Sequence, residues 1–397
     1  MQDAIVIGGG PSGAHFAYQA SKKGYSVSLI ESKSIGRYKC CAGGISKRFL
    51  TTYGIPPKLV ERKITSFQLI SPTGEKAEMD FEDPVGVTVY RTSFDNWLIE
   101  RAINAGSEVS FGVGAKKIHF LKDCTEIELS DGKILRSKLL VGAFGMAPAM
   151  FRELQIKMPE FLIGVQFERS MSQTQIDQLI GNRCEFYYDP VYSNRGYVWV
   201  FPKKEGVSVG LVTGSLEKRK RDTIFNFIRN HPQASRELQT SGPRLFDGSD
   251  FHSAMIPNKP LNVTYGNRFL LLGDAAGLVD QTNWEGIFFA FRSADIAFEV
   301  FEKNYDKSDF SLRGLSAYQR GWKEVFGEEL SYGRKTQSRF YGENMRRVWT
   351  LFVSELNRDE SLKALFKEQL SMGMPVVTAV KKIPLLTKFR LFSKSRM

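Results

Sequence analysis

The sequence predicts an α/β protein with a Rossmann-like parallel sheet, a second, antiparallel sheet and a C-terminal helical region. The first observation is a short apolar run at 4–7, which leads directly into the glycine motif Gly8-x-Gly10-x-x-Gly13. A helical stretch at 11–23 and a second apolar strand at 26–30, which ends on Glu31, follow. This order of strand, glycines, helix, strand and acid is typical of a dinucleotide-binding domain.

Each residue of this motif has a physical role in holding a dinucleotide. Gly8 permits a tight turn, Gly10 lets backbone amides approach a pyrophosphate, and Gly13 lets helix and strand pack closely. Pro11 and Ser12 open the helix, whose free N–H groups and dipole favour the anion. Glu31, with Ser32 and Lys33 behind it, is expected to accept hydrogen bonds from the adenosine ribose.

The second observation is a buried strand at 268–272 that ends on Gly273-Asp274. Asp274 at the carboxyl end of a strand can hydrogen-bond a ribose or ribityl hydroxyl, although it can also be a structural cap. The following helix, expected at 285–301, begins around Gly286 and Ile287, and its free N–H groups would stabilise negative charge on a reduced flavin ring. The strands at 116–141, joined by Asp131-Gly132, are typical of the crossover in FAD-binding folds. The expected cofactor is therefore FAD.

Two further segments of the N-terminal part are candidates for contact with the cofactor. Cys40-Cys41-Ala42-Gly43-Gly44 combines thiols with glycines that permit close approach of a planar ligand. Arg91 ends a strand expected at 87–91 and precedes a helix that continues to Ala105. It could bind a phosphate or ribose, and it could equally pair with Asp95.

The third observation is a set of alternating strands at 161–168, 184–188, 196–201 and 207–212, which predicts an antiparallel sheet with one buried face. Aromatic side chains gather on these strands. They could wall an apolar pocket or form ordinary sheet core, and they include Tyr188, Tyr197, Trp199 and Phe201.

The expected domains follow from these elements. The FAD-binding domain comprises 1–60, 85–160 and 255–300. The antiparallel-sheet substrate domain comprises 61–84 and 161–254. A C-terminal helical region with a basic, apolar tail comprises 301–397.

Composition narrows the function classes. The 397 residues carry a formal charge of +12, which favours an anionic partner, but no nucleic-acid motif appears. The four cysteines form neither a disulfide framework nor a zinc pattern, so no metal is expected.

No apolar run is long enough to span a bilayer and no leader is recognised, so we expect a cytoplasmic protein. The segment 374–394 mixes apolar and basic residues, which suits either the inner surface of a membrane or packing on the protein itself.

Taken together, these residues resemble the geranylgeranyl reductase family, within the flavoprotein superfamily that includes aromatic hydroxylases. The glycine motif with Glu31, the Gly273-Asp274 segment and Arg91-x-x-Phe94-Asp95 match the superfamily. Two features narrow the match to the family. They are Tyr197-Val198-Trp199-Val200-Phe201-Pro202, which resembles its Tyr-x-Trp-x-Phe-Pro signature, and Cys41 with Gly43-Gly44, which resembles its Cys-Gly-Gly segment.

The sequence departs from the family pattern at several positions. Gln281-Thr282-Asn283-Trp284-Glu285-Gly286 stands where the family carries Pro-x-x-Gly-Glu-Gly, so Trp284 replaces a glycine near the expected flavin ring. Phe144-Gly145 replaces Asp-Gly, and Asn194 stands where a proline precedes the aromatic signature.

The resemblance implies a FAD-binding fold of the Rossmann-like GR2 type and an enzyme that saturates C=C bonds of an isoprenoid chain on a lipid or related prenyl substrate. Cys41 would be the catalytic proton donor or part of the pocket wall. Tyr188, Tyr197, Trp199, Phe201 and Trp284 would contact the substrate. The alternatives are a flavin monooxygenase of an aromatic or prenylated substrate and a membrane-associated flavoprotein without catalysis.

The expected partners follow from the same resemblance. The long apolar substrate and the basic surface predict a protein peripheral to a membrane. The electron donor is NAD(P)H, which would visit transiently because no second dinucleotide motif is present, or ferredoxin, which the basic surface would attract. We expect a monomer.

Overall fold

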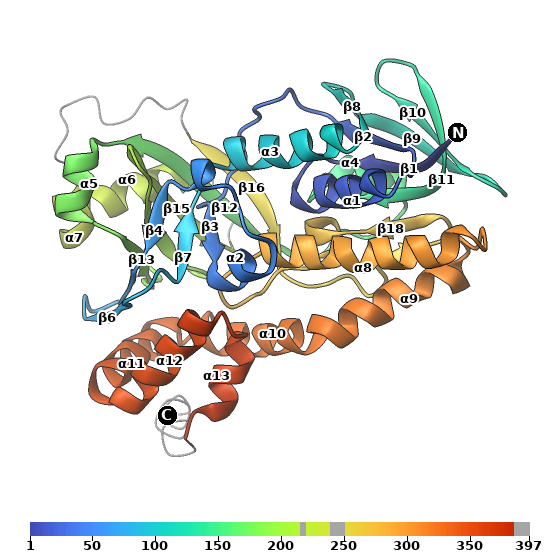
Figure 1. Cartoon of the computed structure of the whole chain (residues 1–397). Coiled ribbons are helices and arrows are strands. Elements are labelled where there is room, and N and C mark those ends of the chain that lie inside the picture. The colour runs from blue at the N-terminus through green and yellow to red at the C-terminus, as the bar shows by residue number, and fades with distance from the viewer. Residues whose placement is uncertain (215–219, 239–250, 385–397) are drawn as a thin grey trace. The chain divides into compact units, whose positions relative to one another are not determined.

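The computed structural model describes residues 1–214, 220–238 and 251–384 (Figure 1). The chain divides into two compact units. Unit 1 comprises residues 1–38, 92–161 and 256–334, and unit 2 comprises 39–91, 162–255 and 335–397. These bounds differ from the three regions expected from the sequence, since residues 39–60 belong to unit 2 and the C-terminal region is divided between the units.

The sheet of unit 1 is a parallel core extended by antiparallel strands. The strands follow the order β17-β18-β11-β1-β2-β8, and β10 and β9 continue from β11. β1 pairs in parallel with both β2 and β11, while β11 pairs in parallel with β18. The strands are β1 (Gln2–Ile7), β2 (Val27–Glu31), β8 (Glu108–Phe111), β9 (Ala115–Phe120), β10 (Thr125–Leu129), β11 (Ile134–Gly142), β17 (Tyr265–Gly266) and β18 (Phe269–Leu271).

Apolar strands and helices build the core of unit 1. Ala4, Ile5 and Val6 have no exposed surface because β1 is central in the sheet. α1 (Pro11–Lys22) packs on α8 (Ile287–Tyr305), and α8 packs on α9 (Leu312–Trp322), which lies beside it in Figure 1. The other helices are α3 (Arg91–Asn104), which begins at the last residue of unit 2, α4 (Pro148–Glu153), the short helix η3 (Gly273–Ala276), the π-helical turn η4 (Lys323–Gly327), and α10 (Glu328–Phe340), which continues into unit 2.

Unit 2 contains a seven-stranded sheet in the order β16-β12-β15-β14-β13-β5-β6. β15 pairs antiparallel with β12 and β14, β13 pairs antiparallel with β14, and β5 pairs antiparallel with β6. β13 pairs in parallel with β5. The four strands expected to form an antiparallel sheet do so, as β12, β13, β14 and β15. A hairpin from early in the chain, β5–β6, joins them through the parallel pair of β5 with β13. The strands are β5 (Ser66–Ile70), β6 (Lys76–Asp80), β12 (Phe161–Ser170), β13 (Arg183–Tyr187), β14 (Val198–Pro202), β15 (Gly206–Thr213) and β16 (His252–Pro257).

One face of this sheet packs on α6 (Lys220–Asn230) and α7 (Pro232–Leu238). Val198 and Val200 of β14 belong to that core, so the alternate residues of β14 face the other way. A small sheet, β3-β7-β4, and a set of helices complete the unit. They are β3 (Gly44–Ser46), α2 (Lys47–Tyr53), η1 (Pro57–Leu59), β4 (Arg62–Ile64), β7 (Gly86–Thr88), α5 (Gln173–Leu179), α11 (Met345–Arg358), α12 (Glu360–Met372) and α13 (Val376–Lys382).

The structure corrects the expected strand at 87–91 and describes only part of the expected basic tail. The strand expected at 87–91 ends at Thr88, and Arg91 is the first residue of α3. Of the basic tail expected at 374–394, residues 385–394 lie outside the described residues. Over the residues that are described, no helix is both long and apolar enough to cross a membrane.

Candidate functional site

The glycine loop of unit 1 lies at the carboxyl ends of three neighbouring strands. Gly8 follows β1, Ala143 follows β11, and Gly273 comes two residues after β18. Because parallel strands end at one edge, these segments meet there. Gly8 has a φ of +109°, and a Cβ on it would lie 2.3 Å from the carbonyl oxygen of Ala143. A Cβ on Gly13 would lie 2.0 Å from the Gly8 carbonyl oxygen. Both positions therefore exclude any side chain.

Gly10 differs from Gly8 and Gly13, because the structure leaves free space where its Cβ would be. It is the N-cap of α1 and has extended backbone, and its missing Cβ would lie 3.6 Å from the nearest atom outside its neighbours, Nη2 of Arg37. No side chain caps the N-terminus of α1. A free helix N-terminus beside an open glycine fits a pyrophosphate, since its N–H groups lack acceptors. The loop thus fits a dinucleotide, with Pro11 and Ser12 as the first helical residues.

Glu31 is held at the end of β2 by several donors. Its Oε2 accepts from the backbone N–H of Gly9 at 3.0 Å and from Nε of Arg37 at 3.1 Å. Its Oε1 accepts from the N–H of Lys33 at 2.9 Å. The carboxylate is buried and fixed beside the glycine loop, as a ribose-binding acid requires. Ser32 and Lys33 are themselves exposed.

The second predicted segment lies against the first. A Cβ on Gly273 would lie 3.0 Å from Oγ of Ser12, and the Gly273 N–H donates to Oγ of Ser293 in α8. A Cβ on Gly286 would lie 3.3 Å from Oδ1 of Asp274. The structure therefore groups the N-termini of α1, η3 and α8, and Ile287 is the buried first residue of α8.

Trp284 adopts a backbone conformation that favours glycine. Its φ is +56°, in the left-handed region that costs most residues free energy. Its N–H donates to the carbonyl of Asp280 at 2.8 Å. The family glycine at this position therefore has a backbone reason, and this chain keeps the turn with a bulky residue. Trp284 lies in unit 1, unlike the other four predicted substrate contacts.

In unit 2 the structure brings together the two segments that resemble the family. A Cβ on Gly44 would lie 3.0 Å from Cε2 of Phe201. Nζ of Lys203 donates to the carbonyl oxygens of Ala42 and Val89, each at 2.7 Å. The segment Cys41–Gly44 thus rests against the end of β14, which carries the aromatic signature.

The predicted aromatic residues of unit 2 are all buried and lie largely on one network. Phe186 contacts both Tyr197 and Phe201, with ring centroids 5.3 Å apart in each pair. Trp199 covers Gly210, and its Nε1 donates to Oγ of Ser208 at 3.3 Å. Tyr188 is stacked on Trp349 of α11, with centroids 3.4 Å apart and planes 8° from parallel. Tyr187, next to it, belongs to the opposite, apolar face of the sheet.

The two thiols at 40 and 41 have different surroundings. Burial raises the pKa of Cys40 to about 12, with a smaller contribution from Cys41, so Cys40 stays a thiol at neutral pH. Cys41 is half-buried. Arg91 is buried at the start of α3. None of the described residues forms a cluster of three or more His, Cys, Asp or Glu able to hold a metal ion.

Residues that the sequence did not single out complete these arrangements. Arg37 links Glu31 to Asp95, with its Nη2 3.1 Å from Oδ2 of Asp95. The sequence offered Arg91 as a possible partner of Asp95, but Arg37 is 58 residues before Asp95, so spacing could not identify it. Lys203 and Trp349 were missed for a similar reason, because an isolated lysine after a strand and a tryptophan in a helix carry no motif.

The fold and the glycine loop define a flavoprotein oxidoreductase, and comparisons with known proteins refine this class. The family model "NAD(P)-binding Rossmann-like domain" matches residues 6–36. The chain is 30% identical to digeranylgeranylglycerophospholipid reductase of Methanosarcina acetivorans, over 83% of this chain and 82% of that protein. It is 29% identical to geranylgeranyl diphosphate reductase of Rhodobacter capsulatus, over 94% and 92% of the two chains.

A solved structure supports the same fold. A geranylgeranyl bacteriochlorophyll reductase-like protein of Thermoplasma acidophilum is similar with a TM-score of 0.78 and 21% identity, over 89% of this chain and 91% of that one. The chain belongs to the geranylgeranyl reductase family and is a FAD-dependent oxidoreductase of that type. The α/β fold class expected from the sequence is confirmed.

Proposed function

We propose that the protein reduces C=C bonds in the isoprenoid chains of a geranylgeranyl-type lipid. The observation that carries the proposal is the contact between the Cys41–Gly44 segment and the end of β14. The segment that carries Cys41 contacts Phe201 of the aromatic signature through Gly44. A thiol close to aromatic side chains suits an apolar substrate that needs a proton. The relatives named above act, by their names, on a digeranylgeranylglycerophospholipid and on geranylgeranyl diphosphate.

The cofactor would be held by unit 1. Backbone amides at Gly10–Gly13 would bind the pyrophosphate, Glu31 the adenosine ribose, and Asp274 a hydroxyl of the ribityl chain. When bound, reduced FAD supplies the hydride for one carbon of the double bond. The predicted contacts of Ala42, Gly43 and Arg91 with the cofactor stay predictions.

The chain's own residues would supply the rest of the chemistry. Cys41 would give its thiol proton to the carbon that does not receive hydride, because it carries an S–H group and is only half-buried. Tyr197, Trp199 and Phe201 would bind the apolar chain and exclude water. Their ring faces would also stabilise positive charge that develops on the alkene, as aromatic faces do for cations.

The substrate headgroup, membrane contact and electron donor belong to this proposal as well. A substrate with two or more long chains would stay in a bilayer, so the protein would collect it at a membrane surface, aided by its net positive charge. NAD(P)H and ferredoxin are both electron donors consistent with the sequence.

Anaerobic single-turnover measurements test the proposal. Protein loaded with FAD and reduced with dithionite is mixed with a digeranylgeranyl phospholipid in detergent or with geranylgeranyl diphosphate. We expect flavin absorbance to return and the lipid to gain two hydrogens for each bond reduced, measured by mass spectrometry. Reduced flavin that stays reduced with both substrates would refute the proposal. An oxygenated product formed only in air would instead support a monooxygenase.

A further inference from the structure

Lys203 is a buried cation that the proposed chemistry has not yet used. It is 1% exposed and belongs to the largest fully buried side chains of the protein. Its hydrogen-bond acceptors among the described residues are two backbone carbonyls, those of Ala42 and Val89. Burying an ammonium group without a directly bonded carboxylate is costly, so the position needs an explanation.

The geometry around Lys203 ties three chain segments together. The Val89 N–H donates to the Gly43 carbonyl at 2.9 Å, and Lys203 bridges the carbonyls of Ala42 and Val89. Gly43 has a φ of +74°, and a Cβ there would lie 2.6 Å from Nζ of Lys203 and 2.0 Å from the Val89 carbonyl oxygen. Lys203 thus fixes the backbone directly after Cys41.

The two hydrogen bonds from Lys203 to backbone carbonyls do not explain why this buried residue is a lysine. A neutral amide could donate to the same two carbonyls at a much smaller desolvation cost. Burial lowers the pKa of Lys203, and four neighbouring groups favour its charged form, Glu168 first and then Cys41, Cys184 and Glu61. The ring of Tyr90 lies 5.3 Å from Nζ. Cys184 is fully buried. Cys41 is the member of this set whose proton the proposed reaction uses.

We propose that Lys203 is a positioning residue for Cys41: it fixes the Cys41–Gly43 backbone through two carbonyls, and its ammonium group stabilises the thiolate that remains when Cys41 gives up its proton. This inference rests on the proposed function. One alkene carbon accepts a hydride from reduced FAD, which is oxidised by two electrons. The other carbon takes the proton as the S–H bond of Cys41 breaks. Solvent then reprotonates the thiolate. FAD would be reduced again by a hydride from an external NAD(P)H, or by two electrons from two reduced ferredoxins with protons from solvent.

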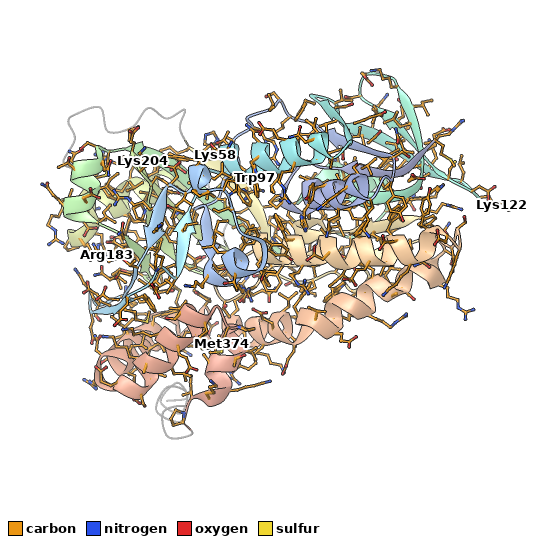
Figure 2. All side chains as sticks on the ribbon, in the orientation of Figure 1. Lys58, Trp97, Lys122, Arg183, Lys204 and Met374 are labelled. Atoms are coloured by element: carbon orange, nitrogen blue, oxygen red, sulfur yellow. The ribbon has the colours of Figure 1, made fainter. Side chains whose placement is uncertain are left out.

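Alkylation of Cys41 tests the charge without any catalytic turnover. FAD-loaded protein is treated with iodoacetamide at pH 8, and modification at Cys41 is followed by fragmentation mass spectrometry, which separates it from Cys40. Lys203→Gln keeps hydrogen-bond donors but removes the charge, so we expect alkylation to slow about tenfold, because only the thiolate reacts. The matched control is Lys204→Met, since the neighbouring Lys204 is exposed (Figure 2). It should react at the wild-type rate.

Lys203→Arg covers the case in which the glutamine variant does not fold. It retains the charge, and we expect alkylation at Cys41 within about twofold of wild type. Thermal melting and the FAD content of each purified variant establish that it is folded. Wild-type alkylation in Lys203→Gln, or slowed alkylation in a folded Lys203→Arg, would overturn the inference.

A double-mutant cycle then tests whether Lys203 acts through Cys41. Flavin reoxidation by the lipid is measured for wild type, Cys41→Ala, Lys203→Gln and the double variant. We expect Lys203→Gln to slow it about tenfold in the wild-type background and to have little effect in Cys41→Ala. An equal loss in both backgrounds would show that the lysine acts elsewhere. If the wild type itself does not reduce the lipid, the proposed function fails, while the alkylation result still decides the role of Lys203.

Discussion

In each unit one arginine contacts two buried acids, and the units differ in how those acids are further satisfied. Arg37 lies 3.1 Å from a carboxylate oxygen of Glu31 and of Asp95, and backbone donors satisfy the rest of Glu31. In unit 2, Lys203 is held by carbonyls, and Arg183, labelled in Figure 2, contacts both Glu185 and Glu237.

The difference indicates which buried acid we expect to be protonated near neutral pH. Burial, then the neighbouring Glu185, raises the pKa of Glu237 to about 8. Glu185 is fully buried and also accepts from Tyr187 and Gln233. Glu237 therefore holds a proton at neutral pH, while Arg37 and two backbone N–H groups donate to Glu31 beside the glycine loop. The predictions below test this comparison.

The first effect is expected at the glycine loop of unit 1. Gly13→Ala places a Cβ 2.0 Å from the Gly8 carbonyl oxygen and 2.9 Å from Cβ of Ala143, so the loop must move. We expect FAD affinity to fall about a hundredfold or more, because the amides lose their alignment. The FAD affinity is measured by titrating the apoprotein with FAD and following flavin fluorescence.

Gly10→Ala is the matched variant. Its Cβ has no neighbour closer than 3.6 Å, so the free protein should keep its wild-type melting temperature. FAD affinity should still fall, about tenfold, if a pyrophosphate lies against this backbone. Unchanged affinity in Gly10→Ala would mean that the pyrophosphate binds elsewhere.

The second effect concerns Arg183. Arg183→Met removes the cation that Glu185 and Glu237 share and leaves Glu237 with Arg236, whose Nη2 lies 3.6 Å from Oε1 of Glu237. We expect unit 2 to lose about 3–5 kcal/mol of stability, the usual cost of removing one partner of a buried ion pair. Chemical denaturation followed by tryptophan fluorescence measures the loss. Lys204→Met, at an exposed site, is the control, and an equal loss there would contradict the explanation.

The third effect is a dependence of stability on pH. Folded Glu237 keeps its proton up to about pH 8, whereas the unfolded side chain loses it near its ordinary pKa of 4.5. Its contribution to stability is therefore complete below pH 4.5 and is lost as pH rises toward 8. Between pH 6.5 and 8 we expect a loss of up to about 2 kcal/mol, at 1.36 kcal/mol per unit.

That pH window is chosen because of His231. Burial lowers its pKa to about 4, so the folded protein keeps it neutral and stability falls as pH drops below 6.5. Above pH 6.5 the slope from this histidine fades within about one pH unit, and its sign is opposite to that from Glu237. Glu237→Gln should remove the loss between pH 6.5 and 8, measured as the shift of the denaturation midpoint. If the stability of Glu237→Gln still falls between pH 6.5 and 8, a group other than Glu237 loses its proton in this range.

The smallest effect is expected at Trp284. Its positive φ strains any residue except glycine. Trp284→Gly and Trp284→Ala both remove the ring, so their difference reports the backbone alone. We expect the glycine variant to be more stable by about 1 kcal/mol, measured by thermal melting. Equal stability would mean that the turn relaxes when the ring is removed.

Unit 1 was predictable because its motif is local. Gly8, Gly10, Gly13 and Glu31 all lie within two strands and one helix, so spacing alone placed them at one sheet edge. The position of Gly273 beside Ser12 followed from the rule that ligands bind at the carboxyl ends of parallel strands. Arg37 could not be predicted, because its contact with Asp95 depends on how α3 packs.

Unit 2 was less predictable because long-range packing decides it. Alternation placed Trp199 and Phe201 on the face opposite Val198 and Val200. It could not place Lys203 against Ala42, 161 residues earlier, or Tyr188 against Trp349. The parallel pairing of β13 with β5 was likewise missed, since strand propensity carries no information on the direction of a distant partner.

The way both units are assembled from separated stretches has a consequence during synthesis. β1 requires β11 and then β18 at residue 269 to complete its sheet, and the hairpin β5–β6 must wait for β13 at residue 183. Early segments therefore leave the ribosome long before their partner strands exist. Unpaired strand edges promote aggregation. We therefore expect nascent chains that end before β18, which begins at residue 269, to depend on chaperones.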